Sequence, residues 1–420
     1  MNNVKLRHTA KHNMYRLKDT VKWIVIAVFI GIILGVTGAL FSKSIAFVTE
    51  LRQTYPKLLF LLPFVAMLIL FIYKYIGKSA SGGTNLVLLA IQKDKDIPLR
   101  MAPLIFISTV ISHMAGASVG REGAALQLGG SIGGFIGKGL RLNDTDKKTL
   151  IMTGMSAAFS ALLGTPIAAS IFSIEVVSVG IMHYSALLPC VIASYIARYT
   201  ASLMGIGALK HRLSFPESVS IPGMAIVLAL AICCGLISIL FCAVLHNGEN
   251  KLSQLIKNEY LKAFLLGSIV LILSLIDGGQ TFNGAGNEYI VSCIDGNERS
   301  VGFLIKILFT ALSIIAGYKG GEIIPSFFIG ASLGSFFGNL IGYDPTLCAS
   351  LGIAGVFCGV TNCPITSLLI YCEIFGFDAA PYALLTCAIS YIISGYYGLY
   401  TDQKIVYSKF RSNFIDKKTL

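Results

Sequence analysis

The sequence predicts an all-α protein that crosses a membrane several times and contains two repeated halves. Only 13% of its 420 residues are charged and 55% are hydrophobic, with a mean hydropathy of +0.75. A soluble protein would carry about twice that charged fraction. Several apolar segments have the length of a spanning helix, and one pattern of glycine, proline and glutamate occurs twice along the chain.

Five apolar segments approach the length of about 20 residues that a spanning helix needs. They are Trp23–Ser42, Leu58–Gly77, Ile221–Leu245, Leu261–Ile276 and Val301–Tyr318. The first is too long for a signal-peptide core and shows no cleavage site, so we expect it to remain as the first helix. Other apolar stretches are short or are interrupted by glycine and proline, which is typical of helices around a transport site.

The charges at the two ends of the chain predict its orientation. Residues 1–22 carry six Lys or Arg residues against one acid, and residues 404–420 carry five against one acid. Because basic flanks remain in the cytoplasm, both termini are predicted to be cytoplasmic in a plasma-membrane protein. The net charge of +12 then reflects topology and contact with anionic lipid, because no zinc-finger or Arg/aromatic pattern indicates nucleic-acid binding.

These observations divide the chain into three parts. Residues 1–22 form a basic cytoplasmic segment, residues 23–403 form one transmembrane domain, and residues 404–420 form a basic cytoplasmic tail. The tail is too short for a folded regulatory domain. The ten cysteines lie mostly in apolar segments without a C-x-x-C pair, so we expect small buried hydrophobic side chains there.

The internal repeat indicates a duplicated bundle. Gly154–Glu175 and Gly352–Glu373 share glycine, phenylalanine, proline, isoleucine and glutamate at identical spacing, 198 positions apart. Just upstream, Gly129–Gly137 matches Gly330–Gly338, 201 positions apart. The halves therefore cover roughly residues 50–205 and 221–403. Such halves commonly pack around a site near the bilayer midplane, and glycine at every fourth position lets their helices approach closely.

A charged pair, Arg121 and Glu122, lies inside an otherwise apolar region between Gly120 and Gly123. The pattern predicts a turn that opens into a helix, whose free N–H groups favour an anion. Glu122 could itself occupy that anion site and leave when it is protonated or displaced. The alternative is a buried Arg–Glu pair that serves packing alone.

Two further glycine-rich helix starts follow the same plan. In the second half, Gly320 and Gly321 precede Glu322, and Pro325 suits the first turn of the next helix. Earlier in the chain, residues 79–91 contain a glycine pair followed by Thr84 and Asn85, either of which could cap a helix. Three such starts in one duplicated bundle would suit a central anion. For the early stretch, an ordinary loop is the alternative.

These motifs resemble the three anion-pathway motifs of the CLC family of chloride channels and anion/proton antiporters. They are Gly120-Arg121-Glu122-Gly123, Gly320-Gly321 with Pro325, and the Gly/Tyr stretch that ends at Tyr400. The resemblance covers nearly the whole chain. It implies a CLC-type fold of two inverted-topology repeats with broken and re-entrant helices, and a homodimer with one pore per subunit.

The resemblance also implies roles for individual residues. Glu122 is the external gating glutamate, which competes with the anion and carries the proton, and Tyr400 closes the inner side of the site. Glu322 is a second candidate for gating and proton coupling. The anion-binding candidates are Gly82, Gly83, Thr84, Asn85, Gly120, Arg121, Gly123, Ile323, Ile324 and Tyr400.

Departures from the chloride members favour the fluoride/proton antiporter branch. Chloride members usually place Gly-Ser-Gly-Ile-Pro at the first helix start, where this chain has Gly82-Gly83-Thr84-Asn85-Leu86. Fluoride is small, strongly hydrated and a strong hydrogen-bond acceptor, so Thr84 and Asn85 are suitable donors. Glu322 after two glycines also resembles the fluoride branch. Val176 stands where chloride/proton exchangers place an inner proton-transferring glutamate, so coupling uses another route or the protein is a channel.

Other functions stay open at this stage. They are a chloride channel or chloride/proton exchanger of the same family, and a membrane scaffold with degenerate motifs. No nucleophile–base set or metal-ligand cluster indicates an enzyme or a cofactor, and His113 alone suggests packing. Glu175 and Glu373 occupy equivalent repeat positions, where we expect helix-end or inter-half polar contacts. Glu322 is expected either to pair with Lys319, three residues away, or to handle protons.

Overall fold

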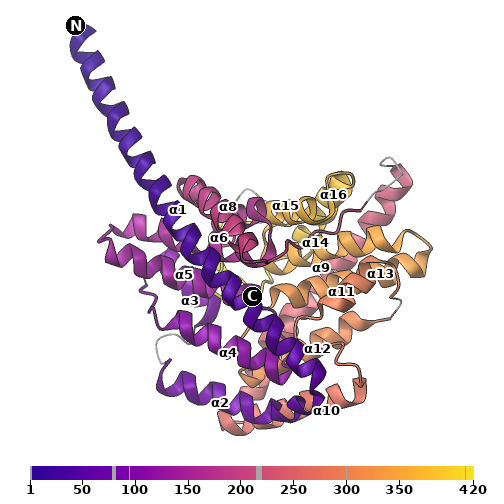
Figure 1. Cartoon of the computed structure of the whole chain (residues 1–420). Helices are drawn as coiled ribbons and strands as arrows, with labels where there is room; N and C mark the ends of the chain where they lie inside the picture. Colours follow the sequence, from indigo (N-terminus) through magenta and orange to yellow (C-terminus); the bar gives the residue numbers. More distant parts are fainter. Residues whose placement is uncertain (1, 78–81, 94, 214–219, 299, 412) are drawn as a thin grey trace.

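The computed structural model describes residues 2–77, 82–93, 95–213, 220–298, 300–411 and 413–420. In these ranges the chain forms sixteen α-helices and a small sheet (Figure 1). The first half contains α1 (Asn2–Thr54), η1 (Pro56–Leu61), α2 (Leu62–Tyr75), α3 (Gly83–Lys93), α4 (Met101–Ala115), α5 (Glu122–Gly139), α6 (Asp144–Leu163), α7 (Pro166–Glu175), η2 (Tyr184–Ala186) and α8 (Leu187–Leu203). The second half contains α9 (Ile221–Leu255), α10 (Glu259–Asp277), α11 (Asn287–Ile294), α12 (Gly302–Ala316), α13 (Ile323–Ile341), α14 (Pro345–Thr361), α15 (Pro364–Phe375) and α16 (Ala380–Ile393).

The two halves are built to one plan, as the repeat predicts. α5 packs against α6 as α13 packs against α14, and α1 packs against α8 as α9 packs against α16. α4 and α12 both end at a left-handed glycine, Gly116 and Gly317, 201 positions apart. α1 is thus the counterpart of α9, which extends the first half back from residue 50. α1 descends through Figure 1 toward α2 and α10, which lie side by side at the bottom.

The glycine spacing produces equivalent close helix contacts in the two halves. A Cβ atom added to Gly129 of α5 would collide with the backbone carbonyl of Gly154 in α6. A Cβ atom on Gly330 of α13 would collide in the same way with the carbonyl of Gly352 in α14. The predicted close approach of these helices is confirmed, because the repeated glycines remove the side chains that would hold the helices apart.

Helices long and apolar enough to cross a membrane account for part of the bundle. Among the described residues they lie in 16–54, 56–75, 184–203, 221–255, 259–277 and 323–341. The predicted segment Val301–Tyr318 forms a helix shorter than a full crossing, since α12 has only 15 residues. Tyr184–Leu203 and Ile323–Ile341 were not among the predicted spans. Several other apolar helices are short, as expected for broken helices.

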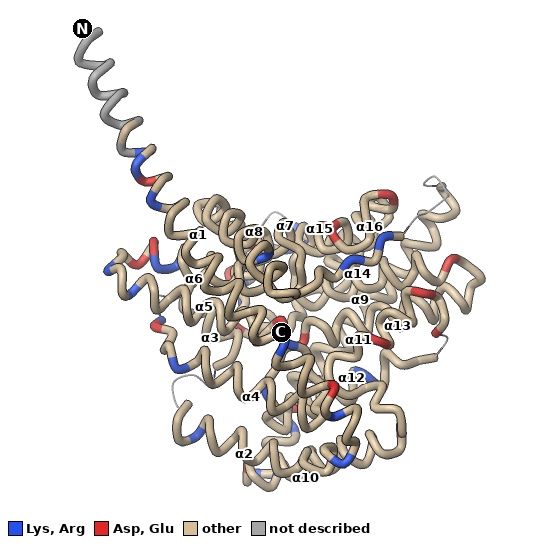
Figure 2. The backbone as a smooth tube through the Cα atoms, viewed as in Figure 1, with Lys and Arg blue, Asp and Glu red and all other residues tan. Residues whose placement is uncertain are grey.

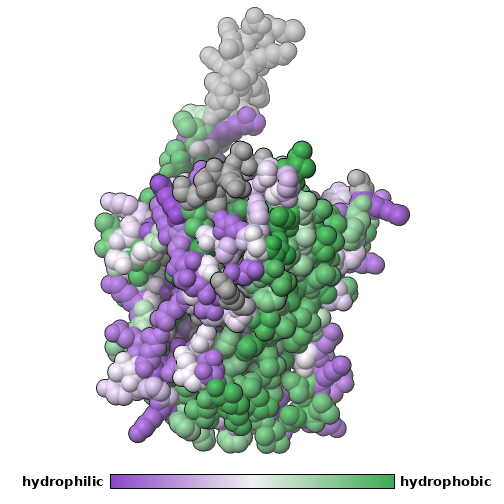
Figure 3. Space-filling view, turned by 90° about the vertical axis from the view of Figure 1, so that its right-hand side faces the viewer, coloured by the Kyte–Doolittle hydropathy of each residue, from purple (hydrophilic) through white to green (hydrophobic). Residues whose placement is uncertain are grey.

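The outer surface has the character of a membrane protein. In Figure 2 the helices are free of charge over most of their length, with Lys, Arg, Asp and Glu mainly near their ends. Figure 3 shows a broad apolar area that extends down one side of the molecule. Large apolar side chains point outward, and Ile221 is 85% exposed. Nine of the ten cysteines are buried and Cys233 is half-buried, which confirms their expected packing role.

The segment after residue 403 is folded, which the all-helical prediction did not include. β2 (Lys404–Tyr407) pairs in parallel with β1 (Ser178–Val179) and antiparallel with β3 (Phe414–Lys418). Between β2 and β3, the Lys409 ammonium donates to the Tyr391 carbonyl at 2.9 Å and to Ser394 Oγ at 3.1 Å. Burial lowers the pKa of Lys409 to about 8. The predicted basic tail therefore docks on the helical body.

Candidate functional site

The two charged turns of the repeat meet directly at their glycines. Gly120 N donates to Gly321 O at 2.6 Å, and Gly321 N donates to Gly120 O at 2.8 Å. Immediately afterwards α5 begins at Glu122 and α13 begins at Ile323, so Arg121 and Glu322 hold equivalent N-cap positions. The first N–H groups of a helix have no partner within the helix and carry partial positive charge. The duplication thus brings two positive helix ends together, with Ile323 and Ile324 buried in the first turn of α13.

Glu122 folds back over the start of its own helix. Its side chain is 1% exposed, and Oε2 accepts a hydrogen bond from Arg121 N at 3.1 Å. Arg121 Nε lies 3.4 Å from Glu122 Oε1, while Arg121 also donates to Ser42 Oγ of α1 at 2.9 Å. The carboxylate therefore lies at the helix start, as the anion-site hypothesis requires, and also forms the Arg–Glu pair. The two sequence interpretations are compatible.

A cavity of about 540 Å³ opens onto Glu122. Its lining includes Arg52, His113, Arg121 and Glu122, together with residues 279–289. Arg52 of α1 is held in place by Gln280 Oε1 at 2.9 Å and by the carbonyl of His113 at 2.7 Å. The guanidinium groups of Arg52 and Arg121 share this cavity with four acids, Glu50, Glu122, Glu288 and Glu298, so opposite charges meet along its wall. The His113 imidazole packs inside α4, where Nδ1 contacts the Thr109 carbonyl at 2.9 Å.

Glu322 is the counterpart of Arg121 and has a different environment. It is half-buried, and a Cβ on Gly123 would lie 3.6 Å from its Oε2, so the carboxylate faces the start of the opposite helix. The predicted Lys319 pair is wrong, because no ion pair joins the two among the described side chains. Lys319 Nζ instead lies 4.6 Å from the Tyr73 ring centre. Residues 319–322 precede the helix, so a spacing of three does not bring these side chains together.

The α3 start also differs from its prediction. Residues 78–81, including Ser79, lie outside the described residues. α3 begins at Gly83 after Gly82, so Thr84 and Asn85 lie in its first turn and cap nothing. Thr84 Oγ1 donates to the Gly123 carbonyl at 3.5 Å and accepts from Gln127 Nε2 at 3.3 Å. The Thr84 hydroxyl therefore joins α3 to α5.

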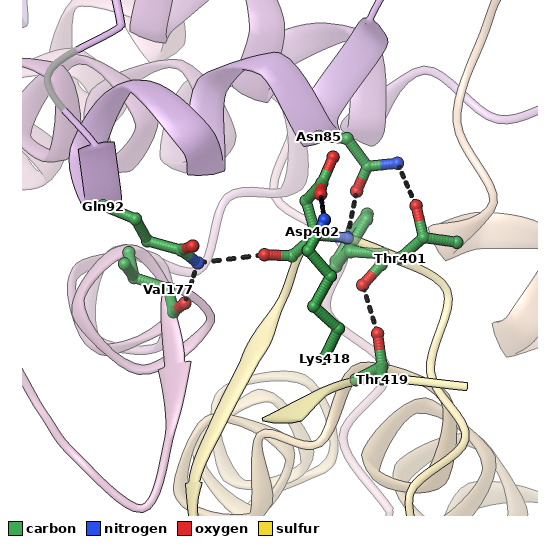
Figure 4. A network of polar contacts seen from close by, with 8 residues as sticks. Asn85, Gln92, Val177, Thr401, Asp402, Lys418 and Thr419 are labelled. Carbon is green, nitrogen blue, oxygen red and sulfur yellow. Dashed lines mark hydrogen bonds and ion pairs between the residues drawn. The ribbon is translucent and has the colours of Figure 1, made fainter. Parts of the chain in front are cut away.

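Asn85 connects α3 to the segment that follows Tyr400. Its Nδ2 donates to Thr401 Oγ1 at 3.0 Å, and its Oδ1 accepts from Asp402 N at 3.2 Å (Figure 4). One amide N–H of Asn85 is thus used within the protein. Tyr400 itself is 2% exposed, and its hydroxyl has no hydrogen-bond partner in the structure. A buried hydroxyl without a partner is suited to donate to a bound anion.

Glu175 and Glu373 make the inter-half contacts that their repeat positions predict. Glu175, at the end of α7, accepts from the backbone N–H groups of Ile365 at 3.1 Å and Thr366 at 2.8 Å in α15. Glu373 of α15 accepts in return from Ile167 at 3.1 Å and Ala168 at 2.8 Å in α7. Each acid thus occupies the start of the other half's helix, which confirms the expected helix-end role.

Sequence reasoning missed the polar groups that hold the inner segment. Gln403 is fully buried and donates to the carbonyls of Val176 at 2.9 Å and Thr361 at 2.8 Å. A glutamine directly after the last apolar run was its only sequence signal. Within the described part of the chain, no three His, Cys, Asp or Glu side chains come close enough to hold a metal ion.

Comparison with known proteins decides the family. The profile described as "Voltage gated chloride channel" matches residues 65–395. The chain belongs to this family. It is 34% identical over 395 residues to a "Chloride/fluoride channel protein" of Pseudomonas syringae pv. tomato, covering 92% of this chain and 87% of that protein. It is 23% identical over 390 residues to the "H(+)/Cl(-) exchange transporter ClcA" of Yersinia pestis, covering 83% and 79% of the two chains.

A solved structure supports the same assignment. The crystal structure of a CLC-type fluoride/proton antiporter superposes with a TM-score of 0.88 at 30% identity, covering 91% of this chain and 98% of that one. This CLC protein is therefore an all-helical membrane protein of the expected fold, apart from its small sheet, and resembles the fluoride/proton branch of the family.

Proposed function

We propose that this CLC protein exports fluoride in exchange for protons, with Glu122 as the group that both gates the anion path and carries the proton. The observation that supports this most directly is the carboxylate of Glu122, folded over the start of α5 beside a cavity that Arg52 and Arg121 also line. Protonation would neutralise the side chain and release it from the positive helix end, so an anion could take its place. The fluoride-named relatives favour fluoride as that anion.

The anion site that we propose lies between the helix starts and Tyr400. Fluoride needs close hydrogen-bond donors to replace its water shell, and the unpartnered Tyr400 hydroxyl can supply one. The backbone N–H groups of Ile323 and Ile324 at the start of α13 are further donors. Gly82, Gly83, Gly120 and Gly123 would let backbone approach the ion. Thr84 and Asn85 would act mainly by holding α3 against α5 and against the Tyr400 segment.

Glu322 is our candidate for the inner proton carrier. Val176 has no acidic group, whereas Glu322 faces Gly123 and lies within electrostatic range of Tyr400. Its position would let a proton pass between Glu122 and the inner side of the site. Such transport requires no enzymatic reaction and no cofactor. We further propose a homodimer in the plasma membrane, surrounded by lipid, with both termini in the cytoplasm.

A chloride channel or chloride/proton exchanger is the second candidate, favoured by the likeness to the Yersinia exchanger. Purified protein in liposomes separates the two. Fluoride and chloride efflux are followed with ion-selective electrodes while external pH is recorded. We expect fluoride efflux to exceed chloride efflux and to drive proton uptake. Equal rates for the two anions, or fluoride flux without proton movement, would contradict the proposal. The Tyr400→Ala and Asn85→Ala variants should change rate or anion affinity more than yield.

A further inference from the structure

The C-terminal strand β3 contacts the backbone of Tyr400 itself. Thr419 follows β3 and is 7% exposed, and its hydroxyl donates to the Tyr400 carbonyl at 2.6 Å. That carbonyl also accepts from Gln403 N at 2.9 Å. Two backbone hydrogen bonds join the same segments: Thr419 N donates to Gln403 O at 3.1 Å, and Leu420 N donates to Tyr396 O at 2.8 Å.

The same short segment is held from the opposite side by α3. Asn85 bonds Thr401 and the backbone of Asp402, while Gln92 Nε2 donates to the Asp402 carbonyl at 3.0 Å (Figure 4). The Lys418 ammonium pairs with the Asp402 carboxylate from the β3 side. Residues 400–402 are therefore held between the first-half helix α3 and residues 418–420.

The position of the Tyr400 ring depends on this clamp. Its hydroxyl has no polar partner, so no hydrogen bond of its own fixes the side chain. Packing and the course of the backbone then determine where the hydroxyl lies. A hydrogen bond to the Tyr400 carbonyl acts on that backbone directly, and a buried carbonyl that loses a partner shifts to find another.

We infer that Thr419 is a positioning residue for Tyr400, so that the docked C-terminal strand sets the geometry of the inner end of the anion path. The inference rests on the proposed role of Tyr400 in that path. Lys409, half-buried at the end of α16, anchors the same strand pair and keeps β3 in place. Removal of the Thr419 hydroxyl should therefore alter how the site binds the anion.

Fluoride transport by liposome-reconstituted full-length variants tests this inference. Thr419→Val keeps the size of the side chain and removes the donor, whereas Thr419→Ser keeps the donor. We expect Thr419→Val to raise the apparent KM for fluoride roughly fivefold, the effect of about one net hydrogen bond, and Thr419→Ser to restore the wild-type value. Lys417→Met, at an exposed position on the same strand, is the control and should leave KM unchanged.

The outcomes separate this inference from the proposed function. If Tyr400→Ala alters transport while Thr419→Val matches wild type, the positioning role is wrong and the anion path stands. If Tyr400→Ala has no effect, the proposed role of Tyr400 fails first. Thermal stability is measured on each variant. A lowered Tm for Thr419→Val with an unchanged KM would show a structural role alone and would overturn the inference. If Thr419→Val cannot be purified, KM of Thr419→Ala decides in its place.

Discussion

The α7–α15 contact and the α5–α13 contact both join the two halves, yet only the first is symmetric. Glu175 and Glu373 exchange the same pair of backbone hydrogen bonds across the pseudo-twofold relation. At the α5–α13 contact the glycines are equivalent, but the N-cap positions carry Arg121 on one side and Glu322 on the other. Duplication has preserved what holds the halves together, while the side chains at the proposed site have diverged. A gated path needs two unlike ends, which a symmetric site could not supply.

The largest expected effect is at Glu122, which has no acidic counterpart in the second half, where Ile323 stands. Glu122→Gln removes the titratable group and should abolish proton movement linked to fluoride flux. External pH during fluoride efflux from liposomes measures this. Glu288→Gln, which changes another acid lining the same cavity, is the control and should retain coupling. Proton movement at the normal rate in Glu122→Gln would remove Glu122 from its proposed role.

The symmetric packing can be broken at its glycines. Gly129→Ala and Gly330→Ala each place a methyl group against a backbone carbonyl that cannot move aside. We expect losses of stability of about 1–3 kcal/mol or more, of similar size in the two variants. Thermal unfolding followed by size-exclusion chromatography measures this. Gly139→Ala on α5 is the control, because open space surrounds that position. Tolerance of one variant but not the other would show that the close packing is not shared.

The reciprocal acids should affect stability without affecting coupling. Glu373→Gln weakens two hydrogen bonds from helix N–H groups, and Glu175→Gln weakens two such bonds and a third from the Thr366 hydroxyl, at an expected cost of about 1–3 kcal/mol each. The loss should be larger for Glu175, which is buried, than for the half-buried Glu373. Melting temperature and the fluoride-to-proton ratio are measured together. A changed ratio in either variant would give this symmetric contact a part in transport.

The smallest expected effect is at Glu322, and it tests the difference between the two N-cap positions of the α5–α13 contact. Glu322→Gln should slow fluoride flux about tenfold, which corresponds to about 1.4 kcal/mol, and weaken proton coupling while the protein stays folded. Lys319→Met should have little effect, because Lys319 packs over Tyr73. If Glu322→Gln unfolds, and the double variant with Lys319→Met restores both folding and proton coupling, then Glu322 pairs with Lys319. The proposed role of Glu322 as a proton carrier would then be wrong.

The repeat and its packing were readable in the sequence because glycine, proline and glutamate have positional meaning. Gly129 and Gly330 predicted close helix contacts, because glycine has no side chain to hold two helices apart. Glu175 and Glu373 predicted inter-half contacts, because an acid is costly in a membrane unless it has a partner. The helix at Val301–Tyr318 is shorter than its apolar segment, because hydropathy does not show where a helix ends. Tyr184–Leu203 escaped notice because its tyrosines, serines and arginine lower its hydropathy.

Contacts between distant segments were the part that sequence could not supply. Thr84 or Asn85 was expected to cap α3, but the helix already begins at Gly83, a difference that composition cannot resolve. Lys319 was expected to reach Glu322 on spacing alone, although no helix connects them. Asn85 and Thr419 carry no motif that links them to the Tyr400 segment. Their contacts depend on docking of the chain end, which follows from the completed fold.

The paired hydrogen bonds between Gly120 and Gly321 limit how this protein can move. They join the backbones of the two halves at the point where the two helix starts meet, and no side chain separates the two turns there. A rocking motion of one half against the other would have to break these two hydrogen bonds in every transport cycle. The proposed mechanism needs only rotations of side chains around this contact, with Glu122 as the group that moves. Transport would then depend on small local displacements of side chains, and the surface in contact with lipid would keep its shape.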